Sequence, residues 1–393
     1  MIIGEKSAAI TGIGQSAVGR RLGRSGLDLT IDACLAAIED AGLSRSDIDG
    51  VSTWPGIVEN LPGFSPVGAP ELKDALRLNL NWISGGMEAS GQLGAIFNAV
   101  AAVSSGFARH VVCFRTLTES SSQGSKGRAS VMGMNSARVS GWSKWMVPFN
   151  GLSAANWTAQ FAQRHFHKYG TTREQLAQIP INGRRNAALN PKAVYRDPLE
   201  LDTYLGARMI STPFCLYDCD VPIDGSTAFI VSHIDAANEL SANPIRIEAI
   251  GSSHNSRWSW DQFDDLSTQA LRDASKMLWK RTELKPCDVD VAEIYDGFSF
   301  TCLDWLEQLG FCNVGEGGSF IEDGREISLR GTLPLNTNGG HLSAGRTHGF
   351  GLLYEACEQL LGRGGARQVD SAKVAAVSAG GGPLAGCMLL TRG

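Results

Sequence analysis

The chain has 393 residues, with 35 Lys and Arg against 40 Asp and Glu, and it is 43% hydrophobic and 19% charged. A net charge of −5 gives no basic footprint for nucleic acid, and no apolar run reaches the ~18 residues that a membrane span requires. The nine cysteines contain no C-x-x-C pair, which argues against a zinc site and a disulfide framework. The length predicts two domains.

The first residues, 1–6, lack a basic stretch followed by a long apolar run, so we expect no secretory signal. Together with the free thiols, this predicts a cytoplasmic protein.

Strand and helix patterns alternate along the first half, which predicts a layered α/β fold. Asp28 is a candidate N-cap for the first helix, and Gly42 follows its end. The predicted strands are 8–11, 48–53 and 110–115, and the predicted helices are 29–41 and 88–105.

The second half repeats this order, with strands at 245–250, 289–294 and 373–378 and helices at 266–279 and 347–361. Each half closes on a small-residue turn that leads into an apolar strand, at 224–231 and at 383–390. This predicts an internal duplication, with halves at 1–240 and 241–393. The polar stretch at about 117–222 is expected to form a loop-and-helix subdomain over the active face.

A glycine-rich turn, Ser378 to Pro383, follows the apolar run 374–377. Because Gly380, Gly381 and Gly382 place no side chain in the way, we expect their N–H groups to face a pocket and to stabilise an oxyanion.

Several motifs resemble the thiolase branch related to sterol carrier protein X. The resemblance implies the duplicated five-layer thiolase fold and a homodimer. It spans nearly the whole chain and rests on 169–177, 186–193, 219–225, Asn336-Thr337-Asn338-Gly339-Gly340 and Gly380-Gly381-Gly382.

The thiolase catalytic groups are replaced at four positions of this sequence. The nucleophilic Cys position holds Ile83, ahead of Ser84-Gly85, and the His-Asp-x-Phe motif is Tyr295-Asp296-Gly297-Phe298. Gly-His-Pro becomes Gly345-Arg346-Thr347, and the second Cys becomes Ser378. Since isoleucine cannot form an acyl-enzyme, we expect no Cys-based thiolysis.

The same losses resemble thiolase-like lyases of the lipid-transfer-protein 2 type, which are retro-aldolases acting on steroid side-chain CoA thioesters. The resemblance implies a catalytic Tyr295 and a small DUF35 partner that completes a heterotetramer. The second tyrosine of that family falls at about Arg346, where this chain departs, while His348 is shared.

A retro-aldol cleavage needs a base, an enolate cradle and an acid. We expect Tyr295 to move protons with Arg346 as a neighbouring cation, His348 to be the alternative acid or base, and Asp296 to orient its neighbours. The cradle would be N–H groups near Gly381 and the Ser84-Gly85 turn.

Each assignment has a structural alternative. Tyr295 could simply be packed, and Arg346 could pair with a carboxylate or a CoA phosphate. His348 could cap a helix, and Ser378 could merely fit the bend.

The function predicted is therefore a carbon–carbon lyase that cleaves a β-hydroxyacyl-CoA, with a CoA thioester as substrate, no permanent cofactor and no metal. The alternatives are a non-catalytic acyl-CoA-binding scaffold and a Cys-independent acyltransferase.

Overall fold

The computed structural model describes residues 4–54, 63–85, 89–123, 139, 141–240, 244–254, 260 and 269–392. In the first half, β1 pairs antiparallel with β8 and β8 antiparallel with β5, while β5, β2 and β3 run parallel. These strands are β1 (Ala8–Gln15), β2 (Gly50–Thr53), β3 (Trp82–Gly85), β5 (His110–Thr118) and β8 (Asp224–His233).

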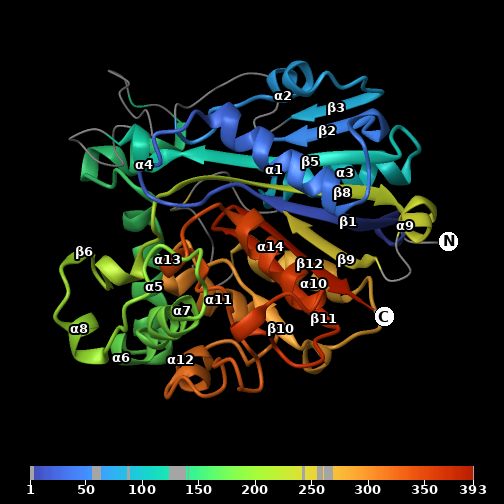
Figure 1. Ribbon diagram of the computed structural model, residues 1–393. Helices are drawn as coiled ribbons and strands as arrows, with labels where there is room; N and C mark the ends of the chain where they lie inside the picture. Colours follow the sequence, from blue (N-terminus) through green and yellow to red (C-terminus); the bar gives the residue numbers. More distant parts are fainter. Residues whose placement is uncertain are drawn as a thin grey trace.

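The second half repeats this pairing scheme, since β9 pairs antiparallel with β12, β12 antiparallel with β11, and β11 parallel with β10. The strands are β9 (Ile245–Ser253), β10 (Val291–Glu293), β11 (Val374–Gly381) and β12 (Leu384–Thr391). A short pairing of β1 with β9 joins both sets into one nine-stranded order (Figure 1). The repeated scheme confirms the predicted duplication.

Helices cover both faces of each set of strands. In the first half, α1 (Gly26–Asp40) and α2 (Ala69–Leu76) form one apolar layer, and α3 (Gly94–Ser104) packs on the opposite face. In the second half, α10 (Ala270–Trp279) packs on β9 and β12. Between the halves, α14 (Gly349–Leu360) contacts β10 and β11 as well as β1 and β8.

Glycines in β1 allow α1 to approach closely. A Cβ on Gly12 would lie 2.2 Å from the carbonyl oxygen of Ala37, and one on Gly14 would lie 2.1 Å from that of Ala33. These glycines therefore serve helix–strand packing.

Between β5 and β8, the described residues form helices that pack on the second half, where α5 contacts α11 (Ser299–Gln308) and α7 contacts α13 (Gly340–Ser343). Figure 1 shows this segment in green, beside α11 and α12 (Gly317–Ile321). A buried bond of 2.9 Å from His165 Nε2 to Glu307 Oε1 ties α5 to α11. The segment comprises α4 (Glu119–Ser122), α5 (Ala154–Tyr169), α6 (Arg173–Leu176), α7 (Gln178–Ala188), α8 (Leu201–Leu205), β6 (Met209–Ser211) and β7 (Phe214–Cys215), and α9 (Ile234–Leu240) follows β8.

The largest departure from the predicted elements is at the start of α3. We expected a helix over 88–105, but a short strand, β4 (Ala89–Gln92), precedes a helix that begins only at Gly94. Gly91 has φ +58°, a left-handed conformation that interrupts regular structure. Within the described part of the chain, no helix is both long and apolar enough to cross a bilayer.

Candidate active site

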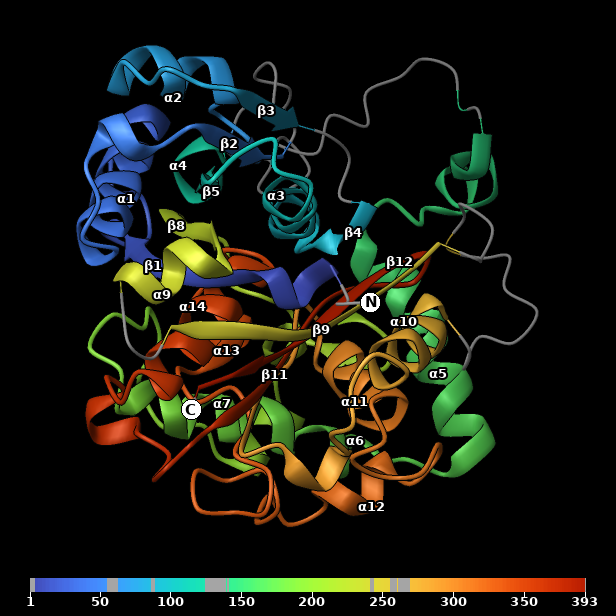
Figure 2. The same ribbon diagram turned by 90° about the vertical axis from the view of Figure 1, so that its right-hand side faces the viewer.

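The candidate site lies where the N-terminal ends of α3 and α14 meet the end of β11. A Cβ on Gly349 would lie 2.7 Å from the side chain of Ala379 and 3.4 Å from that of Leu93, which precedes α3. A Cβ on Gly91 would lie 2.6 Å from the carbonyl oxygen of Ala379. Figure 2 shows β4 beside the end of α3 and next to β12. Glycines at these two positions thus let three elements converge.

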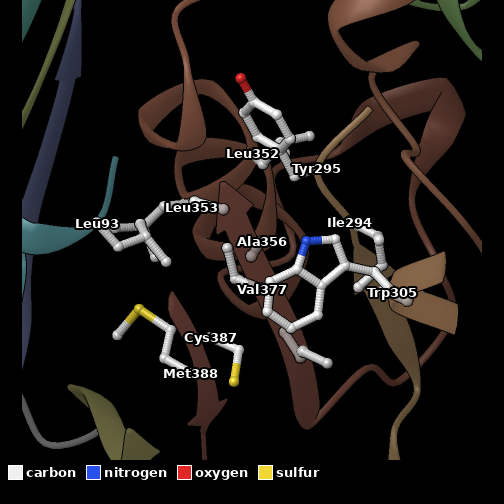
Figure 3. Packing of buried hydrophobic residues seen from close by; sticks show 14 of the residues in the cluster. Leu93, Ile294, Tyr295, Trp305, Leu352, Leu353, Ala356, Val377, Cys387 and Met388 are labelled. Atoms are coloured by element: carbon white, nitrogen blue, oxygen red, sulfur yellow. The ribbon is translucent and has the colours of Figure 1, made fainter. Parts of the chain in front are cut away.

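Tyr295 follows β10 and is held by several contacts. Its backbone N–H donates to Ser378 Oγ at 3.0 Å, and Gln92 Nε2 donates to its hydroxyl at 3.3 Å. A Cβ on Gly297 would lie 2.6 Å from Cε1 of the Tyr295 ring, so only glycine leaves room for the ring there. Figure 3 shows the phenol oxygen pointing away from the apolar cluster that packs beneath the ring. The side chain is 9% exposed, and its ring is fixed while its hydroxyl meets polar groups.

The Asn336–Gly340 turn anchors the loop after β10, in which Tyr295 lies. Asn336 Oδ1 accepts the Ile294 N–H at 2.7 Å, and Asn336 Nδ2 donates to the Ile294 carbonyl at 2.9 Å. Behind the loop, Glu293 accepts the N–H of Thr337 at 3.0 Å and its hydroxyl at 2.7 Å. Burial, reinforced by the negative charge of Glu355, raises the pKa of Glu293 well above its ordinary value. The Asn336–Gly340 turn is thus tied to the backbone that presents Tyr295.

The glycine turn does not form the nest that we expected. β11 continues through Gly381, and Gly380 and Gly381 pair with Ala385 and Leu384 of β12. The N–H of Gly382 donates to Gln269 Oε1 at 2.6 Å, so it is already committed to a side chain. The turn is a hairpin between β11 and β12, and its nearest contribution to the site is the anchor that Ser378 provides for Tyr295.

The placement of Ile83 in the nucleophile position was wrong. Ile83, Ser84 and Gly85 belong to β3, an edge strand of the described sheet, and Ile83 is 47% exposed. The element that leads into α3 is instead β4, which contains Gly91, six residues after Gly85. Local sequence suggested the wrong one of two Ser-Gly pairs, because both precede the same helix. The sequence before Gly91, Glu88-Ala89-Ser90, also has no Cys, so the absence of a nucleophilic thiol at this position holds. Gly86 and Glu88 lie outside the described residues.

Asp296 points to the start of α13. Its Oδ1 accepts the His341 N–H at 2.8 Å and lies 3.1 Å from His341 Nδ1. The other ring nitrogen of His341, Nε2, lies 2.7 Å from the carbonyl oxygen of His348. The His341 ring also meets the Tyr295 ring edge-on, with 5.0 Å between centroids. Asp296 therefore orients a neighbour, and that neighbour is a histidine which contacts both proton-handling candidates.

His348 is the N-cap residue of α14, 1% exposed, with φ +53° and ψ −159°. This region is almost exclusive to glycine and costs of order 1–3 kcal/mol for another residue. Its Nδ1 faces Nη2 of Arg115 at 2.9 Å and Nε at 3.3 Å. Because a guanidinium can only donate, His348 Nδ1 accepts and the proton of the neutral imidazole is on Nε2. His348 is thus arranged to donate through Nε2.

Arg346 was expected beside Tyr295, but its contacts are with carboxylates. Its Nη2 binds Glu119 Oε2, and its Nε lies 3.1 Å from Asp220 Oδ2. The side chains of Arg346, Glu119 and Asp220 are 8%, 0% and 3% exposed. The charge of Arg346 is therefore compensated within a buried ion-pair cluster that joins α4 to the loop before α14.

Two deeply buried thiols near this region are poor nucleophiles. Burial raises the pKa of Cys113 and of Cys302 well above the ordinary value. Since the thiolate is the reactive form, the groups suited to chemistry here are acids and bases, namely the Tyr295 phenol and the His348 imidazole.

Three functional candidates were missed by sequence reasoning: Gln92, Arg115 and His341. Gln92 directly follows the Ser-Gly pair ahead of α3, and Arg115 is a charged residue in an apolar strand. His341 directly follows the Asn336–Gly340 turn. These positions were visible in the sequence, but their partners are far away in the chain.

Comparisons with known proteins show what the whole chain is similar to. Residues 251–390 match the family model described as "Thiolase C-terminal domain-like". The chain is 33% identical to a steroid side-chain-cleaving aldolase of Thermomonospora curvata, with 98% of this chain and 97% of that protein covered. It is 32% identical to the 17-hydroxy-3-oxo-4-pregnene-20-carboxyl-CoA lyase of Mycobacterium tuberculosis, with 90% and 92% covered. The solved Ltp2-ChsH2(DUF35) aldolase superimposes with a TM-score of 0.86 at 31% identity, with 98% of both chains covered.

Proposed function

The chain belongs to the thiolase-fold family that contains these steroid side-chain-cleaving aldolases, and we propose that it cleaves the Cα–Cβ bond of a β-hydroxyacyl-CoA thioester with a steroid or bile-acid skeleton. The proposal rests on similarity over nearly the full length and on one site observation. That observation is the Tyr295 phenol, which is held between Ser378, Gln92 and His341, with no Cys in residues 81–93, the stretch that leads into α3.

The reaction balances without an added reagent. A base removes the proton of the β-hydroxyl, the Cα–Cβ electron pair moves onto the thioester as an enolate, and the carbonyl of a ketone or aldehyde forms at Cβ. An acid then protonates Cα and yields a shorter acyl-CoA. No covalent enzyme intermediate is formed, which agrees with the loss of the nucleophilic Cys.

We assign the proton transfers to the phenol of Tyr295. The buried imidazole of His348 would donate through Nε2 to an oxygen that gains negative charge, the role that preorganised donors play in oxyanion holes. Arg115 favours this arrangement because it keeps Nδ1 of His348 as the acceptor. The CoA thioester enters as substrate, and no resident cofactor or metal has a part in this scheme.

For assembly, we propose a homodimeric core and a small DUF35 partner. The support for the DUF35 partner is the similarity to the solved Ltp2-ChsH2(DUF35) aldolase, and the homodimer is what the resemblance to thiolases implies. The cytoplasmic location stays a prediction, for which the free thiols are the argument.

The test is a turnover assay on the purified chain, alone and with a DUF35 protein. The substrate is a steroid acyl-CoA with a tertiary hydroxyl β to the thioester, and mass spectrometry follows ketone and short acyl-CoA together. Equal release of both products supports the lyase. Binding of the acyl-CoA without turnover in either preparation would favour a scaffold, and formation of a longer acyl chain would favour an acyltransferase.

A further inference from the structure

His341 is the side chain that links the two groups to which we assign proton handling. Its ring centroid lies 5.0 Å from that of Tyr295, and its Nε2 lies 2.7 Å from the carbonyl oxygen of His348. The side chain is 1% exposed and comes from α13, whereas Tyr295 follows β10 and His348 begins α14. A change in His341 would therefore reach both groups.

The bond to His348 bears on a strained backbone. His348 adopts φ +53°, a backbone conformation that is strained for residues other than glycine, so the surrounding contacts must hold it in place. Its carbonyl oxygen accepts from His341 Nε2 and from the Gly351 N–H at 3.2 Å, while Arg115 holds the ring. The Gly351 contact is between backbone groups and the Arg115 contact is between side chains. The His341 contact joins a side chain to the backbone of His348.

Asp296 lies beside the opposite edge of the ring and binds the backbone of His341. The carbonyl of His348 can only accept, so Nε2 of His341 carries a proton. Asp296 Oδ1 lies 3.1 Å from Nδ1 and also accepts the His341 N–H at 2.8 Å. Asp296 directly follows Tyr295 in the chain, so the carboxylate that orients His341 moves with the tyrosine. The ring thus donates one hydrogen bond from Nε2, has Asp296 Oδ1 3.1 Å from Nδ1, and lies next to the Tyr295 ring with 5.0 Å between centroids.

We propose that His341 is a positioning residue that couples Tyr295 to His348: its side chain lies against Tyr295, and its Nε2–H bond to the carbonyl of His348 keeps His348 in the strained conformation. This inference rests on the proposed function, because it assigns the two groups to one reaction.

Two near-isosteric variants separate the two edges of the ring. His341→Gln places an amide N–H near the position of Nε2 and can still donate to the His348 carbonyl. His341→Asn places its amide near Nδ1 and keeps only the Asp296 side. We expect His341→Asn to lower kcat by about 100-fold, the usual effect of a misplacement of about 1 Å, with KM changed less than about 3-fold. His341→Gln should stay within about 5-fold of wild-type kcat.

The inference fails if both variants turn over like wild type, or if both lose activity equally in step with a lower melting temperature. A simple packing role predicts the second result, since both variants remove the same ring. The opposite order, with Asn active and Gln inactive, would also overturn it, because it would place the function of His341 on the Asp296 side.

A second measurement does not need turnover. In protein labelled with ¹⁵N-histidine, the His348 ring should show a proton on Nε2 and a bare Nδ1 in wild type and in His341→Gln, but altered shifts in His341→Asn. If wild type shows no cleavage yet these shifts follow the expected order, the proposed function fails and the coupling stands. If wild type cleaves and the shifts are equal in both variants, the coupling fails alone.

Discussion

Arg346→Met is the sharpest test of how the loop before α14 is held. The guanidinium binds Glu119 and Asp220, and all three side chains are at most 8% exposed. Removal of the cation leaves both carboxylates buried without the positive charge of Arg346. Breaking a buried ion pair in this way typically costs about 3–5 kcal/mol, far more than an exposed pair is worth.

The expected change in melting temperature follows from the size of the chain. Unfolding entropy is about 2.1 cal/mol/K per residue, so a chain of 393 residues changes stability by about 0.8 kcal/mol per degree near its melting point. A loss of about 4 kcal/mol therefore corresponds to a melting temperature about 5 °C lower. Differential scanning calorimetry resolves a shift of this size.

Two controls make the result specific. Arg363→Met removes an ion pair with Asp40 whose side chains are 46% and 22% exposed, so it should cost less than about 1 kcal/mol. Adding Glu119→Gln and Asp220→Asn to Arg346→Met removes the two carboxylate charges and should restore most of the lost stability. If Arg346→Met and Arg363→Met melt alike, the argument from buried charge is refuted. If kcat fell by more than the loss of folded protein explains, Arg346 would have a role in proton transfer as well.

Three further outcomes are expected. Tyr295→Phe should lower kcat at least about 100-fold with little change in stability; near-normal turnover in the acyl-CoA assay would remove Tyr295 from the mechanism. Gly297→Ala should lower kcat more than it raises KM, because its Cβ would lie 2.6 Å from the Tyr295 ring; unchanged steady-state kinetics would contradict the close fit. Burial and then the charge of Glu307 raise the pKa of Asp304 from 3.8 to about 8. The folded state therefore holds a proton that the unfolded state releases, and the free energy of unfolding should decrease from about pH 4 to about pH 8, by at most about 1.4 kcal/mol per pH unit. Urea titrations across this range should show a flatter profile for Asp304→Asn, and equal profiles would contradict the shift.

The sequence alone determined the duplicated α/β organisation. The alternation of apolar strands, capped helices and glycine turns is local, and it recurs in both halves, so the repeat could be identified before any contact was known. It also determined that the nucleophilic Cys is gone and that Tyr295 stands at the end of a buried strand. These conclusions depend on residue type and on neighbours within about ten positions.

Only the tertiary structure decided which side chains form the site. Arg346 and Glu119 are separated by 227 positions, and His348 and Arg115 by 233, so no local pattern could pair them. The same holds for the start of α3, where Gly91 must fit against β11. It also holds for Gly382, whose N–H donates to Gln269, a residue 113 positions away in the chain. Hydrogen-bond donors and charges find partners through the packing of the whole chain. The identity of the chemical groups was therefore readable in the sequence, while their partners, and with them the roles of Arg346, His341 and the glycine turn, were decided by the fold.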